Sequence, residues 1–363
     1  MKIDLIAGAR PNFMKIAPII EAIHKAQKEG NEISYRLIHT GQHYDKNMSG
    51  SFFDQLGIPA PNVNLEAGGG TQAEQTAAIM IGYEKLLIKE KTDLCLVVGD
   101  VTSTMACAIS AQKLHIPVAH IEGGIRSGDW SMPEEINRMV TDSITNYFFT
   151  TTEIANKSLR KLGIEDERIF FVGNTMIDTL LKHRHRFQKP AIWDEIGLSK
   201  GKYIVMTLHR PSNVDEEEKL GDLINEIILN SRGLDLIFPV HPRTAKILNH
   251  LGIKNERLHM IEPLGYLEFN FLVESSFLVI TDSGGITEET TVMGIPCMTL
   301  RDNTERPETI TIGTNELIGT NPKTIKPAMD KLFSGQWKKG GIPELWDGKT
   351  SERIVDVLLK MKK

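Results

Sequence analysis

The stretch FLVITDSGGITEE, residues 277–289, has the pattern of one strand-turn-helix unit of an α/β protein. Its apolar first half, FLVIT, is typical of a buried strand in a parallel sheet. Gly284 and Gly285 allow a tight turn, and the sequence after them predicts a helix. A helix that begins in this way presents backbone N–H groups to an anion, so the stretch predicts a phosphate site as well as a fold.

Runs of the same kind recur along the chain in two sets, one before residue 172 and one that starts at YIVMTLH, residues 203–209. Strands that alternate with helices predict an α/β protein with two Rossmann-like domains, each a parallel sheet with helices on both faces. We expect residues 1–172 to form the first domain, joined by a C-terminal helix at about 350–363, and residues 173–349 to form the second. In the glycosyltransferase-B-like arrangement that we predict, the two domains face a cleft.

Composition supports an ordinary globular protein of this size. The chain has 363 residues, a net charge of −5 and a hydrophobic fraction of 40%, and its basic residues are scattered, so we expect no nucleic-acid partner. Its start, MKIDLIAGA, does not have the pattern of a signal peptide, and no apolar run approaches the ~20 residues that span a bilayer. We expect a cytoplasmic protein with no membrane partner and three reduced cysteines.

The first strand is followed by GARPNFMK, residues 8–15. Arg10 and Lys15 are cationic near a helix start, which favours anion binding, although an ordinary turn with two solvated cations is the alternative. The segment matches neither the GxGxxG pattern nor a P-loop, so neither a nicotinamide cofactor nor ATP is indicated.

Three carboxylates follow further strands of the first set: Asp100 in VVGDVTST, Glu122 in HIEGGIRSGD and Glu134 in MPEEINR. Asp100 could be an N-cap, and Glu134 with Glu135 could simply match a helix dipole, whereas Glu122 has no capping role. Because the carboxyl ends of parallel strands share one edge, we expect the three acids to converge there. Their mutual repulsion should raise at least one pKa, which suits a general acid paired with a general base.

The second set of strands is followed by basic residues and by residues that suit nucleotide binding. His209 and Arg210 follow one strand in TLHRPSN, and His241 follows the next in PVHPRT. The backbone of Ser283, Gly284 and Gly285 suits a diphosphate, and an acid one turn later, Glu289, can accept ribose hydroxyls. The loop TLRDNTERPE, with Arg306, is either an internally paired loop or a lid on the nucleotide. No histidine or cysteine set has metal-ligand spacing, so we expect no metal.

Read in order, GARPNFMK, GQHYD, VVGD, HIEGG, MPEEINR, FVGNTMID, TLHRPSN, PVHP, DSGGITEE and TERPE resemble the UDP-N-acetylglucosamine 2-epimerase family over nearly the whole chain. The resemblance implies interconversion of UDP-GlcNAc and UDP-ManNAc without cofactor, on a UDP-linked amino sugar, by a homodimer that supplies surface polysaccharide precursors. It implies elimination of UDP to a 2-acetamidoglucal and its re-addition. Carried over by motif, the catalytic residues are Asp100, Glu122, Glu134 and His209. The nucleotide-binding residues carried over in the same way are Arg10, Ser283, Gly284 and Glu289. We also expect substrate or UDP binding by Lys15, Arg138, Arg210, His241, Gly285 and Arg306.

The sequence leaves several alternatives open. HRPSN, GQHYD and MPEEINR are similar to the branch that acts on UDP-2,3-diacetamido-2,3-dideoxyglucuronate, and GQHYD departs from the glutamine-rich segment that binds an activating second UDP-GlcNAc. A hydrolysing epimerase that gives ManNAc and UDP is a further alternative. So is a glycosyltransferase of the same fold, although three acids exceed its needs. A regulator that binds nucleotide sugars without turnover would have no use for all three acids.

Overall fold

A computed structural model describes residues 1–41, 55–240 and 242–361 of the chain. It divides into two compact units, Met1–Lys182 with Glu344–Lys363, and His183–Pro343. The predicted fold class, two α/β domains with parallel sheets, is confirmed. The division falls after residue 182 rather than at 172/173, because α7 (Thr175–His183) is tied to the first unit by the bond from Thr179 Oγ1 to the Met14 carbonyl, 2.6 Å.

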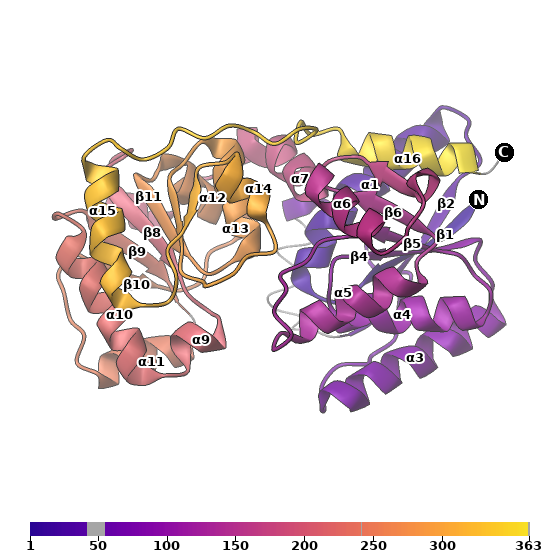
Figure 1. Cartoon of the computed structure of the whole chain (residues 1–363), viewed down its shortest axis with the longest axis horizontal. Coiled ribbons are helices and arrows are strands. Elements are labelled where there is room, and N and C mark those ends of the chain that lie inside the picture. Colours follow the sequence, from indigo (N-terminus) through magenta and orange to yellow (C-terminus); the bar gives the residue numbers. More distant parts are fainter. Residues whose placement is uncertain (42–54, 241, 362–363) are drawn as a thin grey trace. The chain divides into compact units, whose positions relative to one another are not determined.

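The first unit contains a seven-stranded parallel sheet in the order β3-β2-β1-β4-β5-β6-β7. The central strands are continuous apolar runs because both faces are covered: α3, α4 and α5 lie on one face, and α1, α7 and α16 on the other (Figure 1). Tyr83 of α3 and Cys107 of α4 pack against Val97 of β4 in its core. The elements are β1 (Lys2–Ala7), α1 (Arg10–Lys28), β2 (Ser34–His39), β3 (Val63–Asn64), α3 (Gln72–Lys89), β4 (Leu94–Val98), α4 (Thr102–Lys113), β5 (Val118–Ile121), α5 (Pro133–Ile144), β6 (Tyr147–Thr150), α6 (Glu153–Lys161), β7 (Ile169–Phe171), α7 and α16 (Thr350–Met361), with a 3-10 turn at Asp166–Arg168.

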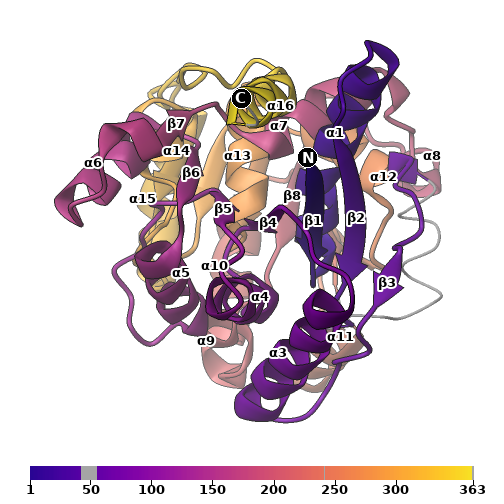
Figure 2. The same cartoon turned by 90° about the vertical axis from the view of Figure 1, so that its right-hand side faces the viewer.

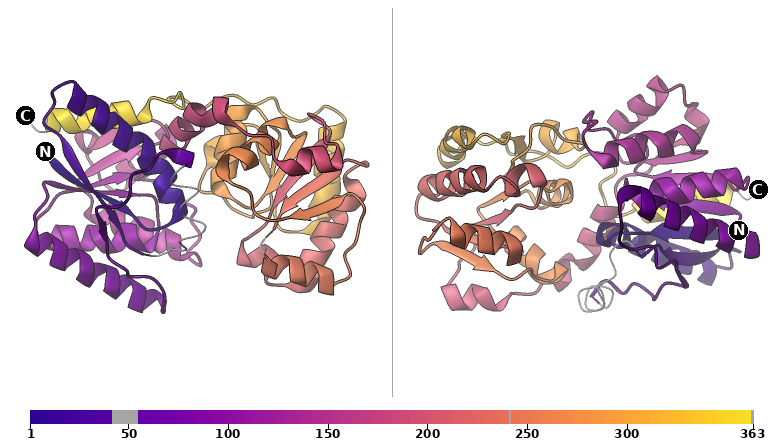
Figure 3. Two further views of the ribbon diagram at one scale, coloured as in Figure 1. Left: turned by 180° about the vertical axis from the view of Figure 1, so that it is seen from behind. Right: turned by 90° about the horizontal axis from the view of Figure 1, so that it is seen from below.

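The C-terminal helix α16 belongs to the first unit, where it lies beside α1 (Figures 2 and 3). Both carboxylate oxygens of Asp178 accept hydrogen bonds at its start, from Thr350 N at 3.0 Å and Ser351 N at 2.6 Å. Ahead of the helix, buried Trp346 donates from Nε1 to the Thr151 carbonyl. The C-terminal segment is therefore held by two residues that are distant in sequence, Asp178 and Thr151, which precede their partners by 172 and 195 residues.

The second unit has a six-stranded parallel sheet in the order β10-β9-β8-β11-β12-β13, again a Rossmann-like order. One face packs on α10, α11 and α15 around Phe238, and the other on α8, α12 and α13 around Val205. The elements are α8 (Ala191–Ile196), β8 (Tyr203–Thr207), α9 (Pro211–Val214), α10 (Glu217–Asn230), β9 (Asp235–Pro239), α11 (Pro242–His250), β10 (Leu258–Ile261), α12 (Tyr266–Ser275), β11 (Leu278–Thr281), α13 (Gly284–Met293), β12 (Cys297–Thr299), α14 (Pro307–Thr311), β13 (Asn315–Leu317) and α15 (Ile325–Phe333), with 3-10 turns at Arg184–Arg186 and Pro322–Thr324.

Candidate active site

In each unit the strand order reverses between two adjacent strands, β1 and β4 in the first and β8 and β11 in the second. Open α/β sheets bind ligands outside the carboxyl ends of such strands. In the first unit Asn12 joins these ends: its Oδ1 accepts from Gly8 N and Ala9 N, and its Nδ2 donates to the Val98 carbonyl at 3.0 Å. The two loops that flank the reversal are therefore fixed to one another.

Lys15 and Glu122 form a buried ion pair at this edge. Lys15 Nζ lies 2.8 Å from Glu122 Oε2, and the two residues are 9% and 4% exposed. Gly99 leaves room for the pair, since a Cβ there would lie 3.3 Å from Lys15 Nζ. The sequence assigned Lys15 to an anion, and the anion that the structure gives it is the carboxylate of Glu122.

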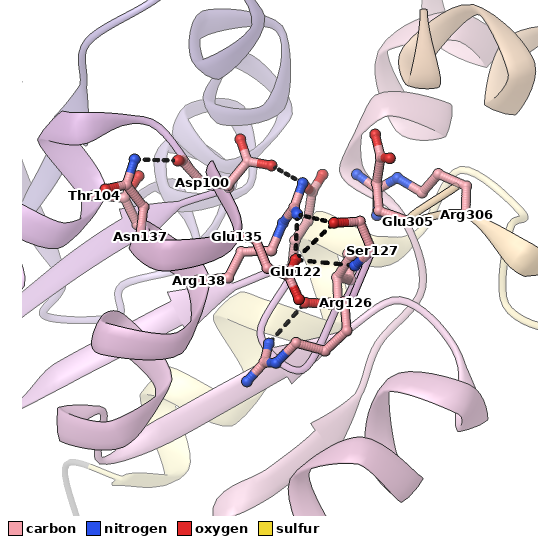
Figure 4. Close-up of polar contacts among 12 residues, drawn as sticks. Asp100, Thr104, Glu122, Arg126, Ser127, Glu135, Asn137, Arg138, Glu305 and Arg306 are labelled. Atoms are coloured by element: carbon pink, nitrogen blue, oxygen red, sulfur yellow. Dashed lines mark hydrogen bonds and ion pairs between the residues drawn. The ribbon is translucent and has the colours of Figure 1, made fainter. Parts of the chain in front are cut away.

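Arg138 of α5 connects two further carboxylates (Figure 4). Its guanidinium lies 2.5 Å from Asp100 Oδ2 and 2.7 Å from Glu135 Oε2. Burial raises the pKa of Glu135, but hydrogen bonds from Ser127 and Gly128 and the ion pair with Arg138 outweigh it, so the pKa lies below the usual range. Arg138, which the sequence assigned to substrate binding, here holds the Asp100 side chain in place.

The two acids that open α5 have different surroundings. Glu135 is 2% exposed, and its carboxylate is occupied by Ser127, Gly128 and Arg138. Glu134 is half-buried, and within the described part of the chain its side chain makes no hydrogen bond or ion pair. Of the pair, Glu134 is the acid whose carboxylate remains available for chemistry.

Cations separate the carboxylates that were expected to repel one another. Glu122 is matched by Lys15 and Asp100 by Arg138, so charge alternates along the edge. The sequence reasoning counted the acids that follow each strand and left out the cations that three-dimensional folding brings between them.

In the second unit, Asp282 fixes the loop after β8 through hydrogen bonds. It is fully buried and accepts hydrogen bonds from the backbone N–H groups of His209 and Arg210 and from Asn213 Nδ2. Its Oδ1 lies 2.7 Å from His209 Nδ1, while the imidazole itself is 63% exposed. Burial raises the pKa of Asp282, but the His209 contact and the donated hydrogen bonds bring it below the usual range.

A carboxylate acceptor at Nδ1 means that His209 carries a proton on that nitrogen. Nε2 is then the nitrogen that can give or take a proton, as in other histidines oriented by an aspartate. Sequence reasoning selected His209 and missed Asp282. The available signal was an aspartate directly after the apolar run of β11, which pairs with β8 in parallel register, Thr281 beside Thr207.

The start of α13 has the glycine-opened form that the sequence predicted, with Ser283 as N-cap and Gly284 and Gly285 as the first two residues. A Cβ at Gly284 would lie 2.5 Å from Glu305 Oε1, so a larger residue here would displace the Glu305 carboxylate. Glu305 in turn lies 2.6 Å from Arg301 Nη2. A carboxylate therefore already lies against the helix start where a negative charge is favoured.

One turn into α13, Glu288 and Glu289 are both buried and differ in their partners. Glu288 pairs with Arg306 at 3.0 Å, which places the predicted nucleotide-binding Arg306 beside a carboxylate. Glu289 accepts a hydrogen bond from Tyr266 Oη at 2.9 Å. Burial raises its pKa to about 7, although the hydrogen bond from Tyr266 and the nearby amide of Asn270 act in the opposite direction.

Several predicted residues fall outside this description. His241 and residues 42–45 of GQHYD lie outside the described residues, and of Arg10 the structure describes the position at the start of α1 but not the side chain. Arg210 donates from Nε to the Asp282 carbonyl at 2.9 Å. Among the residues that are described, no group of three His, Cys, Asp or Glu side chains could hold a metal ion, and no helix is long and apolar enough to cross a membrane.

Comparison with known proteins gives one consistent family. The family model for UDP-N-acetylglucosamine 2-epimerase matches residues 25–359. The UDP-N-acetylglucosamine 2-epimerase of Methanocaldococcus jannaschii is 42% identical, with 99% of each chain covered. The UDP-2,3-diacetamido-2,3-dideoxy-D-glucuronate 2-epimerase of Pseudomonas aeruginosa is 40% identical, over 99% of this chain and 100% of that one. The crystal structure of the M. jannaschii enzyme in complex with UDP-GlcNAc and UDP superimposes with a TM-score of 0.88 at 41% identity, over 99% and 100% of the two chains.

Proposed function

This chain belongs to the UDP-N-acetylglucosamine 2-epimerase family, and from that premise we propose that it interconverts UDP-GlcNAc and UDP-ManNAc. The observation that carries the proposal is the set of carboxylates at the carboxyl ends of β4 and β5. Asp100 and Glu122 are each held by a cation, and Glu134 lies in the first turn of α5, the helix that carries Arg138. Epimerisation at C2 needs more than one proton-handling group, because a proton leaves one face and returns to the other.

The C2 proton of the sugar is not acidic, so cleavage of the C1–O bond has to assist its removal. We propose that UDP leaves with the electron pair of that bond while a base takes the C2 proton, which gives a 2-acetamidoglucal. UDP then adds back to C1, and an acid delivers a proton to the opposite face of C2. Asp100, Glu122 and Glu134 are the proposed proton-handling and charge-stabilising groups.

The second unit supplies the proposed nucleotide site. The backbone N–H groups of Gly284 and Gly285 suit the diphosphate, and Glu289 suits the ribose hydroxyls. Ser283, the third proposed residue, donates its N–H to Thr281 Oγ1 at 3.0 Å and would have to exchange that bond. His209, with Nδ1 fixed by Asp282, is the proposed donor to the departing diphosphate, from Nε2 of the protonated ring. Arg10, Arg210, His241 and Arg306 complete the proposed set of phosphate partners. Diphosphate entry requires Glu305 to move from Gly284 or to be neutralised by the nearby guanidinium groups.

The test is proton NMR of the purified protein with UDP-GlcNAc in deuterated water. Deuterium at C2, with UDP-ManNAc formed and no net release of UDP, supports the proposal. Free ManNAc with stoichiometric UDP indicates hydrolysis instead. UDP release that depends on an added acceptor indicates a glycosyltransferase, and UDP binding without any turnover of either sugar indicates a regulator.

A second candidate substrate is UDP-2,3-diacetamido-2,3-dideoxyglucuronate. The P. aeruginosa relative at 40% identity bears this activity in its name, and the HRPSN segment, residues 209–213, favours it. The same NMR experiment with that sugar, run in parallel, separates the two by kcat/KM. A ratio of kcat/KM above about tenfold in favour of either sugar corresponds to ~1.4 kcal/mol of transition-state binding and decides the assignment.

We further propose that the protein works as a cytoplasmic homodimer that supplies surface polysaccharide precursors. Cys95, Cys107 and Cys297 are buried and free, which suits a reducing compartment. Light scattering at micromolar concentration distinguishes a dimer from the 40.6 kDa monomer.

A further inference from the structure

A histidine and an aspartate form a buried hydrogen-bonded pair next to the loops that carry Asp100 and Glu122. His120 of β5 and Asp142 of α5 are each 1% exposed. His120 Nδ1 lies 2.7 Å from Asp142 Oδ1, and Nε2 lies 2.7 Å from the carbonyl oxygen of Gly99, at the end of β4. None of the roles proposed above uses this pair of side chains, which we call the buried pair.

The geometry limits the protons that the pair can hold. A carbonyl oxygen can only accept, so His120 Nε2 carries a proton. Nδ1 faces a carboxyl oxygen, and a lone pair on each atom at 2.7 Å would repel, so one more proton lies between them. Turning the ring over would place carbon atoms at these two contacts and lose both hydrogen bonds.

The remaining donors locate that second proton on the imidazole. Asp142 Oδ2 accepts from Gly124 N at 3.0 Å and pairs with Arg126 Nη1 at 2.7 Å, and both contacts stabilise a carboxylate. Burial raises the pKa of Asp142, but the His120 and Arg126 contacts outweigh it and leave the pKa below the usual range. The neighbours of His120 in the sheet, Val97 and Phe148, are apolar. Asp142, with Arg126, faces Nδ1, and the ion pair of Lys15 and Glu122 lies at Gly99, the residue that Nε2 contacts.

We propose that His120, held as an imidazolium, is a positioning residue that ties the end of β4 to the loop after β5 and thereby sets Asp100 against Glu122. The inference rests on the proposed function of those two acids. His120 does not touch the substrate in this account. It acts through Gly99, which directly precedes Asp100, and through Asp142, which holds the loop that follows Glu122.

The loop after β5 is a place where such a support is needed. Glu122 has φ of 69°, a left-handed conformation that is strained for a non-glycine residue. Its N–H bonds to the Phe149 carbonyl at 2.9 Å, and Asp142 holds Gly124 two residues later. A Cβ at Gly123 would lie 2.8 Å from the Phe148 ring, so the turn has no room to relax toward that strand. Losing the buried pair should let Glu122 leave this conformation.

The first test reads the protonation of the ring directly. Protein labelled with ¹⁵N-histidine is examined at about pH 8, well above the ordinary histidine pKa of about 6.5, with the His120 signals assigned from the His120→Gln spectrum. Two protonated ring nitrogens are expected in the wild type, and one in Asp142→Asn. A wild-type His120 with one unprotonated nitrogen overturns the proposal. This measurement does not depend on the reaction that the protein catalyses.

The second test measures the positioning role in folded variants, checked by circular dichroism. In His120→Gln the side-chain NH2 can still donate to the Gly99 carbonyl, but the amide cannot also donate to Asp142 as the protonated ring does. We expect kcat to fall about 100-fold, which is the loss that a displacement of ~1 Å in an active site produces. KM and UDP affinity are expected to change by less than about threefold, since the nucleotide is bound elsewhere. His24→Gln, the same change at an exposed position of α1, is the matched control and should be neutral.

The outcomes separate this proposal from the proposed function. A wild type that turns over neither candidate sugar refutes the function, and the ring protonation then still decides the charge of His120. A folded His120→Gln variant with wild-type kcat on an active enzyme overturns the positioning role. A fall in kcat together with an equal rise in KM also overturns it, since that pattern would reflect general loss of the fold.

Discussion

The two units place charge at their strand ends in different ways. In the first, carboxylates and cations alternate: Lys15 with Glu122, and Arg138 with Asp100. In the second, one buried aspartate, Asp282, orients an exposed histidine, and Glu289 is buried against a neutral tyrosine hydroxyl. Both sheets have the same Rossmann-like strand order, so the difference lies in the loops and not in the fold.

We infer from this difference that the first unit acts on the sugar and the second unit binds the nucleotide. Ion-paired carboxylates keep a fixed charge and a fixed position, which suits groups that must meet a developing positive centre on a sugar. A glycine-opened helix start and a buried carboxyl group without a cationic partner at hydrogen-bond distance in the described residues suit a ligand that brings its own negative charge and its own hydroxyl donors.

The largest effect is expected from the acids of the first unit. Asp100→Asn and Glu122→Gln should each reduce kcat roughly 1,000-fold, because each removes a proposed proton-handling carboxylate. UDP affinity, measured by calorimetry, should stay within about threefold of wild type. Glu90→Gln is the control, since it removes an ion-paired carboxylate near the start of β1, where Lys2 and Arg36 contact it. Near-normal rates in either test variant would refute the catalytic assignment.

The next effect concerns the oriented histidine of the second unit. Asp282→Asn should reduce kcat about 100-fold, because an amide no longer selects the tautomer of His209 with the proton on Nδ1. Asp235→Asn is a close control: Asp235 also contacts a histidine in this unit, His259 at 3.0 Å, but at the beginning of β9. Equal losses in the two variants would mean that the effect is one of stability rather than orientation.

A smaller effect is expected for Glu289, whose contribution to the free energy of unfolding falls as pH rises. Its pKa is raised from 4.5 to about 7 in the folded state, so the folded protein holds this proton more tightly than the unfolded chain. The corresponding stability is present below about pH 4.5 and is lost as pH rises toward 7. At pH 8 the loss amounts to at most about 3 kcal/mol.

Glu289→Gln should therefore be more stable than wild type at pH 8 by about 1–3 kcal/mol, and equally stable at pH 4.5. It should also bind UDP about tenfold more weakly, because an amide is a poorer acceptor for ribose hydroxyls than a carboxylate. Denaturant melts at both pH values and UDP calorimetry measure the two effects. Glu288→Gln, which removes the carboxylate that faces Arg306, should instead lower stability at pH 8. A Glu289→Gln variant that is less stable at pH 8 would contradict the argument.

The smallest effect belongs to a carboxylate of the first unit that lies away from the strand ends. Asp178→Ala removes both acceptors at the start of α16 and should lower the free energy of unfolding by about 1–2 kcal/mol, as the loss of a helix cap does. kcat at 25 °C should be unchanged. Asp356→Ala, at an exposed position of the same helix, serves as the control. A fall in kcat for the folded Asp178 variant would extend the catalytic machinery beyond the strand ends.

Much of the fold could be predicted because buried parallel strands are continuous apolar runs, such as LCLVV in β4 and LVIT in β11. β3 was missed because it has two residues, Val63–Asn64, which is too short for any periodic signal. The domain boundary was predicted too early, since nothing local to α7 reveals that Asp178 holds a helix at the far end of the chain.

The sequence predicted which residues belong to the candidate site, but not which of them form ion pairs with one another. Motifs named Asp100, Glu122 and His209, whereas Lys15 with Glu122 and Arg138 with Asp100 join segments that are distant in sequence. The Glu135–Arg138 pair at i,i+3 was accessible from helix spacing alone, and would have shown that Glu135 is the structural acid of MPEEINR. Asp282 escaped notice because an aspartate before SGG is easily interpreted as a cap.

The attachment of α16 to the first unit also has a consequence for biosynthesis. The second unit, residues 183–343, is an insertion between the body of the first unit and its last helix. A ribosome that elongates at about 5–20 residues per second needs on the order of 10 to 30 s to make that insertion. Throughout that interval Asp178 and the face of α1 that contacts α16 lack their partner, because α16 has not been synthesised. The nascent first unit is then the exposed species, and the release of the C-terminal helix from the ribosome is the step that completes it.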